Sequence, residues 1–186
     1  MARHFIEQTE SPFSGFYLHD VHALTRQLRL LAQRRDGRRI LILGVTFGLL
    51  DWAEGKEDLT FLGRIPDLVV METGGMKGRR REMLREEVHE VLTARLGVRS
   101  IHSEYGMTEL LSQGYSQGEG VFRPGYTMRL LLRDPNDPFD VREYGQYAGT
   151  AGINVVDLAN LDSCSFIETQ DLGRFGSEPN TFYVMG

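Results

Sequence analysis

Cysteine and long apolar runs are the features that this sequence of 186 residues most clearly lacks. Its one cysteine, Cys164, has no partner for an internal disulfide, and we interpret it as a small buried side chain rather than a nucleophile. The longest uncharged apolar run, residues 40–50, is far shorter than the roughly 20 residues that cross a bilayer. The first residues also lack the apolar core of a secretory signal. We therefore expect a cytoplasmic protein without a membrane span.

Basic side chains are scarce in the last third of the chain, where residues 134–186 contain two arginines and nine acidic residues. Such an acidic surface repels phosphate groups, which argues against a nucleic-acid partner. Repeats and low-complexity linkers are also missing. Hydrophobic residues make up 41% and charged residues 25%, as in globular proteins. We expect residues 1–186 to form a single domain.

Hydrophobic periodicity predicts an α/β part, residues 1–121, followed by a β-rich part, residues 122–186. In the first part, short apolar runs that suit buried strands alternate with helical segments, two of which Asp20 and Thr46 are expected to cap. The expected strands are residues 40–43, 68–71 and 98–102, and the expected helices are residues 21–36, 46–53 and 80–96. This order predicts a parallel βαβαβ sheet with flanking helices. The second part predicts strands at residues 127–133, 152–157, 165–169 and 181–185.

Ligands of open parallel sheets bind outside the carboxyl ends of the strands. Three loops follow these ends here, at residues 44–46, 72–75 and 103–109. The third loop carries an aromatic ring, a glycine, a hydroxyl and a carboxylate, in Tyr105, Gly106, Thr108 and Glu109. These groups can stack a base, admit a phosphate, donate a hydrogen bond to it and hold its magnesium ion. The same residue types build an ordinary capped turn before a helix, so spacing alone leaves both interpretations open.

Other candidate residues also have two interpretations. The pair Gly74-Gly75 marks either a ligand-contacting loop or a simple turn. Asp171 either accepts hydrogen bonds from a ribose or belongs to an Asp-x-Gly turn. Four basic residues gather near the start of the helix expected over residues 80–96: Lys77, Arg79, Arg80 and Arg81. Because the helix dipole disfavours cations there, they indicate either an anion site or a solvated turn offset by nearby glutamates.

Several of these segments resemble one enzyme superfamily. Residues 105–109, Tyr-Gly-Met-Thr-Glu, resemble the Y-G-x-T-E signature of the adenylate-forming superfamily. Residues 169–171, Thr-Gln-Asp, are similar to its T-G-D ribose motif, and Gly74-Gly75 matches the pair that lines adenine. Over longer stretches the chain looks like the LuxE-like acyl-protein synthetases of this superfamily, at residues 42–47, 71–79, 101–111 and 153–160.

The resemblance implies an α/β fold that is part of the large domain of such an enzyme. It also implies an activity, the ATP-dependent activation of a fatty acid to an acyl-adenylate with release of pyrophosphate. The acyl group would then pass to a thiol, either of a protein or of coenzyme A. ATP, AMP and magnesium are the implied cofactors.

Matching positions assign a role to each candidate residue. The implied cofactor contacts are Gly74, Gly75, Tyr105, Gly106, Thr108 and Asp171. Among them, Tyr105 would stack on adenine and Asp171 would bind the ribose. Thr108, at the α-phosphate, and Glu109, holding magnesium, would be the catalytic residues.

Parts of the family pattern are missing. No Ser/Thr/Gly-rich phosphate loop precedes Gly44, and the resemblance reaches Gly186 without the family's hinge and C-terminal domain. We therefore expect these residues to be the middle of a larger enzyme, to be inactive alone, and to form homo-oligomers through exposed apolar surface. A non-catalytic nucleotide-binding or assembly module and an aryl-CoA ligase are the alternatives.

Overall fold

A computed structural model describes residues 2–34, 37–76 and 78–185 of the chain. Its helices are α1 (Ala2–Thr9), α2 (Val21–Arg34), α3 (Thr46–Ala53) and α4 (Arg85–Leu96), with a 3-10 helix η1 (Thr60–Arg64). The first five strands are β1 (Ile40–Val45), β2 (Leu68–Thr73), β3 (His102–Tyr105), β4 (Gly114–Ser116) and β5 (Phe122–Pro124). The others are β6 (Met128–Asp134), β7 (Asp137–Arg142), β8 (Ala151–Asp157), β9 (Phe166–Phe175) and β10 (Phe182–Val184). No helix within the described ranges is long and apolar enough to cross a membrane.

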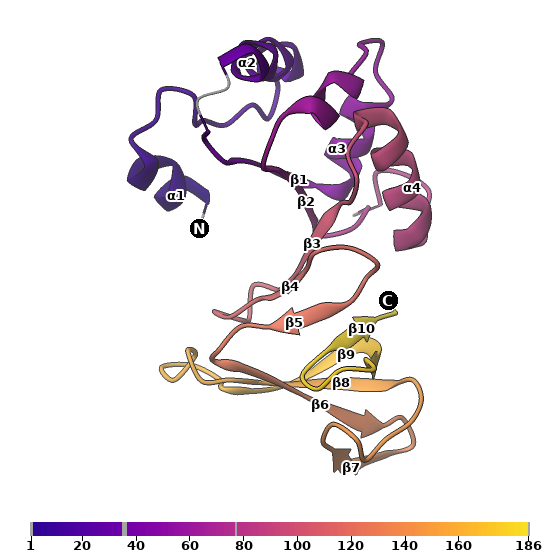
Figure 1. The fold of residues 1–186 in the computed structure, drawn as a ribbon. Helices are drawn as coiled ribbons and strands as arrows, with labels where there is room; N and C mark the ends of the chain where they lie inside the picture. Colours follow the sequence, from indigo (N-terminus) through magenta and orange to yellow (C-terminus); the bar gives the residue numbers. More distant parts are fainter. Residues whose placement is uncertain (1, 35–36, 77, 186) are drawn as a thin grey trace.

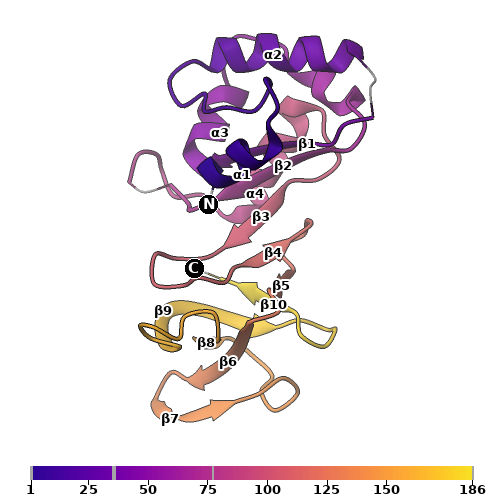
Figure 2. The ribbon, with the colours of Figure 1, turned by 90° about the vertical axis from the view of Figure 1, so that its left-hand side faces the viewer.

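The strands form one sheet in the order β1-β2-β3-β4-β5-β10-β9-β8-β6-β7. Strands β1, β2 and β3 pair in parallel, and the remaining pairs are antiparallel. Figure 1 shows α3 and α4 on one side of β1–β3 and α1 on the other, while β7 lies at the far end of the molecule. Figure 2 shows the same succession from helices to strands after a quarter turn. The predicted fold class, a parallel α/β sheet followed by a β-rich portion, is confirmed.

Two groups of buried side chains stabilise the fold. The helix-covered core lies between β1–β3 and the helices, and its members include Leu28, Ile42, Leu50, Trp52, Leu62, Val70, Val88, Leu92, Leu96 and Ile101. The strand core lies within the second part, with Tyr105, Leu110, Phe122, Met128, Leu130, Leu132, Ala151, Ile153, Val155 and Phe182. Tyr105 and Leu110 join the strand core although they precede residue 122. The division at residues 121 and 122 stays a prediction.

The helix expected over residues 80–96 begins later than predicted, at Arg85. The Glu87 carboxylate accepts a hydrogen bond from the Leu84 backbone N–H at 2.9 Å, which closes the first turn of α4 at that point. Leu84, which falls within the range expected to be helical, is therefore outside the helix and 67% exposed. Gly97 ends α4 in the left-handed conformation, with a φ of 68°.

Other boundaries differ because strand pairing depends on distant residues. The third strand is β3, His102–Tyr105, rather than residues 98–102, so Tyr105 ends a strand instead of lying in the following loop. Asp171 lies within β9 and not after it. Strands β4, β5 and β7 were not predicted. Cys164 is exposed, so its interpretation as a buried side chain was wrong.

Candidate functional site

Tyr105 and Asp171, 66 positions apart in the sequence, meet in the fold. The Tyr105 hydroxyl donates a hydrogen bond of 2.8 Å to Oδ2 of Asp171. Strand β3 brings the tyrosine to the carboxyl end of the parallel strands. The aspartate lies on β9, which β4, β5 and β10 separate from β3 in the sheet order. The two residues expected to contact adenine and ribose are thus direct neighbours.

The Tyr105 ring is buried among aromatic side chains and is only 7% exposed. It packs edge-on against Phe122 and Phe182, with ring centroids 6.2 Å and 5.6 Å away. Burial and the hydrogen bond to the Asp171 carboxylate both raise the pKa of Tyr105, so the phenol stays protonated and remains a donor. In this arrangement the Tyr105 hydroxyl is bonded to one oxygen of the Asp171 carboxylate, the group expected from the sequence to bind a ribose.

The glycine pair lies at the carboxyl end of β2, beside β3. Thr73, the last residue of β2, pairs with Glu104 of β3, and the next residues of the two strands are Gly74 and Tyr105. Both glycines are exposed and have positive φ angles, 78° and 63°. Among the described residues, no atom outside the immediate chain neighbours lies within 4 Å of the position that a Cβ of Gly75 would take. This open backbone can be approached closely by a flat ligand.

Thr108 and Glu109 lie on a loop with exposed side chains. The described backbone over residues 106–113 forms no helix, so these residues do not cap one, contrary to the alternative interpretation. Gly106 opens the loop, and a Cβ there would come within 3.1 Å of Gln113 Cγ. Among the described residues, no three His, Cys, Asp or Glu side chains cluster around a metal position. A magnesium ion at Glu109 would therefore need phosphate oxygens and water as further ligands.

A buried carboxylate holds this loop from below. Asp157, fully buried at the end of β8, accepts hydrogen bonds from the Leu111 and Ser112 backbone N–H groups at 2.8 Å and 2.9 Å. Its other oxygen accepts the Ser112 hydroxyl at 2.6 Å. Burial raises the pKa of Asp157, but the hydrogen bonds from Ser112, Leu111 and Ala159 outweigh it and hold the pKa below its usual value.

Asn160 supports the same loop a few residues on. Its side-chain amide donates a hydrogen bond of 2.7 Å to the backbone carbonyl of Glu109. Both Asp157 and Asn160 belong to residues 153–160, which the sequence marked only by family resemblance. The sequence contained no local signal for their role, because their partners lie about 50 residues away.

The basic residues do not form an anion site at a helix N-terminus. Arg80 pairs with Glu54, and its Nη1 lies 3.5 Å from the Asp51 carboxylate, both on or next to α3. The Arg79 guanidinium lies 5.2 Å from the centre of the Phe47 ring. Lys77 lies outside the described residues. The expected position of Arg79 and Arg80 at the start of the helix was wrong, because α4 begins only at Arg85.

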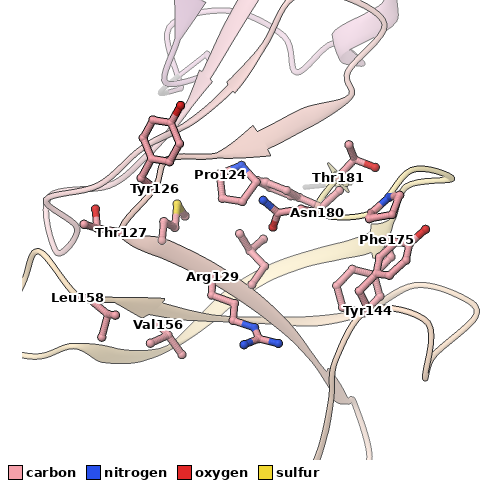
Figure 3. A pocket seen from close by; sticks show the side chains of 14 residues that line it. Pro124, Tyr126, Thr127, Arg129, Tyr144, Val156, Leu158, Phe175, Asn180 and Thr181 are labelled. Atoms are coloured by element: carbon pink, nitrogen blue, oxygen red, sulfur yellow. The ribbon is translucent and has the colours of Figure 1, made fainter.

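A cavity of about 600 Å³ opens on the β-rich part (Figure 3). Apolar side chains of β6, β9 and β10 line it, among them Met128, Leu130, Phe175 and Phe182, and Tyr126 and Arg129 lie at its edge. Phe182 also contacts the Tyr105 ring, so it separates this cavity from the candidate nucleotide residues. None of the residues that line the cavity in the described part of the chain is a predicted site residue.

The sheet, parallel at β1–β3 and antiparallel beyond them, has a topology that can be compared with known structures. The sequence matches no protein-family model and no curated protein. Its fold is similar to that of ATP-bound MatB from Rhodopseudomonas palustris, with a TM-score of 0.57 and 15% identity over 87% of this chain and 33% of MatB. It is also similar to NpsA-ThdA, a fused adenylation–PCP di-domain from Klebsiella oxytoca, with a TM-score of 0.58, 12% identity, and coverage of 93% and 31%.

Coronafacic acid ligase from Pectobacterium brasiliense is a third similar structure, with a TM-score of 0.55, 14% identity, and coverage of 90% of this chain and 32% of the ligase. The chain spans about a third of the length of these three proteins. At such identities the likeness shows the fold alone. That fold is the one expected from Tyr105-Gly106 and the glycine pair.

Proposed function

We propose that this chain is the part of an adenylate-forming enzyme that binds the adenosine half of an acyl-adenylate. The observation that carries the proposal is the contact between Tyr105 and Asp171, because it joins the two motifs from which the function was inferred. The open Gly74-Gly75 backbone beside them and the exposed Glu109 fit a nucleotide with its phosphates. The ATP-bound state of the similar MatB structure supports the same reading.

Within this class, we propose fatty-acid activation with transfer of the acyl group to a protein thiol, as in the LuxE-like acyl-protein synthetases. The resemblance of residues 153–160 to that family supports this finer assignment, and two of these residues, Asp157 and Asn160, bond to the loop that carries Thr108 and Glu109. Transfer to a carrier or to coenzyme A is the second candidate. The similarity to an adenylation–PCP di-domain favours it.

The proposed roles follow from the position and chemistry of each side chain. ATP supplies the α-phosphorus on which the adenylate forms. When the nucleotide binds, the hydrogen bond from the Tyr105 hydroxyl to Asp171 breaks, and the Asp171 carboxylate accepts hydrogen bonds from the ribose hydroxyls instead. The Tyr105 ring then rotates so that its face stacks on adenine. Thr108 donates a hydrogen bond to the α-phosphate, and Glu109 offers its carboxylate to magnesium.

Calorimetric titration of the chain with a non-hydrolysable fatty-acyl adenylate analogue tests the proposal. Asp171→Ala and Tyr105→Ala should each weaken binding by about tenfold or more, through loss of charge-assisted hydrogen bonds and of stacking area. Tyr105→Phe is the matched variant: it keeps the ring and frees Asp171, so affinity should stay equal or rise. Exposed Asp162→Ala is the control. A folded chain that does not bind the analogue would contradict the proposal.

Pyrophosphate exchange tests whether these residues suffice for catalysis. We expect purified 1–186 not to exchange labelled pyrophosphate into ATP, since no phosphate loop is found in it. Robust exchange that Glu109→Ala abolishes would show that the missing elements are dispensable.

A further inference from the structure

A network of polar side chains is buried directly below the glycine pair. Its centre is Glu72, which is 6% exposed and lies near the end of β2. Thr46, the first residue of α3, and Ser103 of β3 are equally buried around it. None of these residues belongs to the proposed nucleotide contacts, so the network needs a separate explanation.

Thr46 connects Glu72 to the glycine pair. Its hydroxyl donates a hydrogen bond of 2.6 Å to Oε2 of Glu72 and accepts one of 3.1 Å from the Gly75 backbone N–H. Thr46 was predicted to cap α3, but the cap residue is Val45, and the threonine side chain makes no cap bond. The hydroxyl is thus used for the loop after β2 rather than for its own helix.

Glu72 itself is fixed by α4 and β3. His89 Nε2 lies 3.7 Å from Oε1 of Glu72 and 3.2 Å from the Ser103 hydroxyl, and Arg85 Nε lies 3.8 Å from the same carboxylate oxygen. Burial raises the pKa of Glu72, but the nearby polar groups of His89, Ser103 and Thr46, together with the Arg85 charge, lower it below its usual value. The carboxylate therefore stays ionised and keeps its acceptor oxygens towards Thr46.

A buried charge of this kind is a poor way to gain stability alone, because well-packed apolar residues often stabilise a core equally well. Its effect here is to orient the Thr46 hydroxyl towards the Gly75 backbone N–H. The Gly75 N–H is held while Gly74 and Gly75 adopt left-handed φ angles, a conformation that a free glycine pair would share with many others. Fixing the loop before a ligand arrives removes part of the ordering cost of binding.

We propose that Glu72 is a positioning residue that acts through Thr46 to preset the Gly74-Gly75 backbone for a flat ligand. The part of this inference that concerns the ligand rests on the proposed function. The part that concerns the backbone does not, and the two can be tested separately.

Amide hydrogen exchange at Gly75, measured without ligand, tests the backbone part. Thr46→Val removes the hydroxyl at nearly constant volume and should speed Gly75 exchange by about fivefold or more, the equivalent of one hydrogen bond. Thr46→Ser keeps the hydroxyl and should retain protection, while Glu72→Gln should fall between the two. Thr25→Val is the matched control: Thr25 is a buried threonine whose hydroxyl bonds to Trp52 in the same core.

Exchange at Leu92, deep in the helix-covered core, separates a local effect from general destabilisation. Thr46→Val and Thr25→Val should change Leu92 exchange to a similar degree, but only Thr46→Val should release Gly75. Unchanged Gly75 exchange in Thr46→Val, or equal release in Thr25→Val, would overturn the positioning role. If Thr46→Val does not fold, comparison of Glu72→Gln with Thr46→Ser decides the question by the same readout.

Titration with the non-hydrolysable fatty-acyl adenylate analogue tests the ligand part. Thr46→Val and Glu72→Gln should each weaken binding by about fivefold, and Thr46→Ser should restore it. Wild-type affinity in Thr46→Val would overturn the link to the ligand. Absence of binding in the wild-type chain would count against the proposed function, while the exchange result would still decide whether Glu72 positions the loop.

Discussion

The helix-covered core and the strand core both bury a carboxylate below the candidate site, but they connect it to the site differently. Glu72 reaches the Gly75 backbone through one intermediate side chain, Thr46, and is held by residues of α4 and β3. Asp157 accepts backbone N–H groups of the site loop directly. Glu72, on the parallel strand β2, therefore acts on its loop through a second side chain, whereas Asp157, at the end of the antiparallel strand β8, bonds to its loop directly.

Tyr105 links the two regions. Its backbone belongs to β3, beside the parallel strands, but its ring packs in the strand core on Phe122 and Phe182. Its hydroxyl reaches Asp171 on β9. Since one continuous sheet joins both regions, we expect them to unfold together.

The largest expected effect is that of truncating the aromatic group of the strand core. Phe182 is 2% exposed and packs on both Phe122 and Tyr105, so Phe182→Ala should lower the free energy of unfolding by about 3–5 kcal/mol. Urea unfolding should be followed by circular dichroism and by the fluorescence of Trp52, the one tryptophan, which lies in the helix-covered core. Both signals should shift together.

Phe139→Ala is the matched control, because Phe139 is 94% exposed on β7 and should contribute little. Trp52 fluorescence that keeps its wild-type midpoint in Phe182→Ala, while circular dichroism shifts, would show that the two cores unfold independently.

The next effect concerns the carboxylate of the strand core. Asp157→Ala leaves the N–H groups of Leu111 and Ser112 without their acceptor and should cost about 2–4 kcal/mol of unfolding free energy. Because these residues follow Glu109, affinity for the adenylate analogue should fall as well. Asp157→Asn retains one acceptor oxygen and should lose less on both measurements. Equal losses in the two variants would mean that charge, rather than the acceptor position, matters.

Lowering the pH should remove the contributions of both carboxylates, Glu72 and Asp157, to the free energy of unfolding. The pKa values of Glu72 and Asp157 both lie below their usual values in the folded state, so each contributes stability that is present above its unfolded pKa, about 4. That stability is lost as the pH falls through the folded pKa. Urea unfolding between pH 7 and pH 3 should show a shallower decline in Asp157→Asn and in Glu72→Gln than in the wild type. If the free energy of unfolding declines as steeply in both variants as in the wild type, the two carboxylates do not contribute the expected pH-dependent stability.

The elements that were predicted correctly are those in which local sequence decides the structure. The period of Val21, Leu24 and Leu28 set α2, and Asp20 caps it through the Ala23 N–H at 2.8 Å. The apolar runs that begin at Ile40 and Leu68 became β1 and β2. Tyr105 and Asp171 were singled out together only through family motifs, because a contact over 66 positions leaves no periodic signal.

The remaining features depend on partners that a local pattern does not specify. Strands β4 and β5 are each three residues long and exist through pairing with β3 and β10. Thr46 looks like a helix cap in sequence, but its hydroxyl bonds to groups at the end of β2, the Glu72 carboxylate at 2.6 Å and the Thr73 carbonyl at 3.3 Å. The start of α4 was missed because a leucine rarely precedes a helix, and the bond from its N–H to Glu87 replaces the usual side-chain cap.

The smallest expected effect tests the basic residues for which the sequence left two interpretations, an anion site or a solvated turn. Arg80 lies against Glu54 and Asp51 at the end of α3, in the helix-covered region, with its side chain 26% exposed. Because a partly exposed ion pair contributes little, Arg80→Ala should lower the free energy of unfolding by only about 0.5–1 kcal/mol and leave analogue affinity unchanged. Exposed Arg81→Ala is the control and should change neither. A tenfold loss of affinity in Arg80→Ala without loss of stability would instead mean that Arg80 leaves its acidic partners to meet the ligand, and the two regions would then share the phosphate contacts.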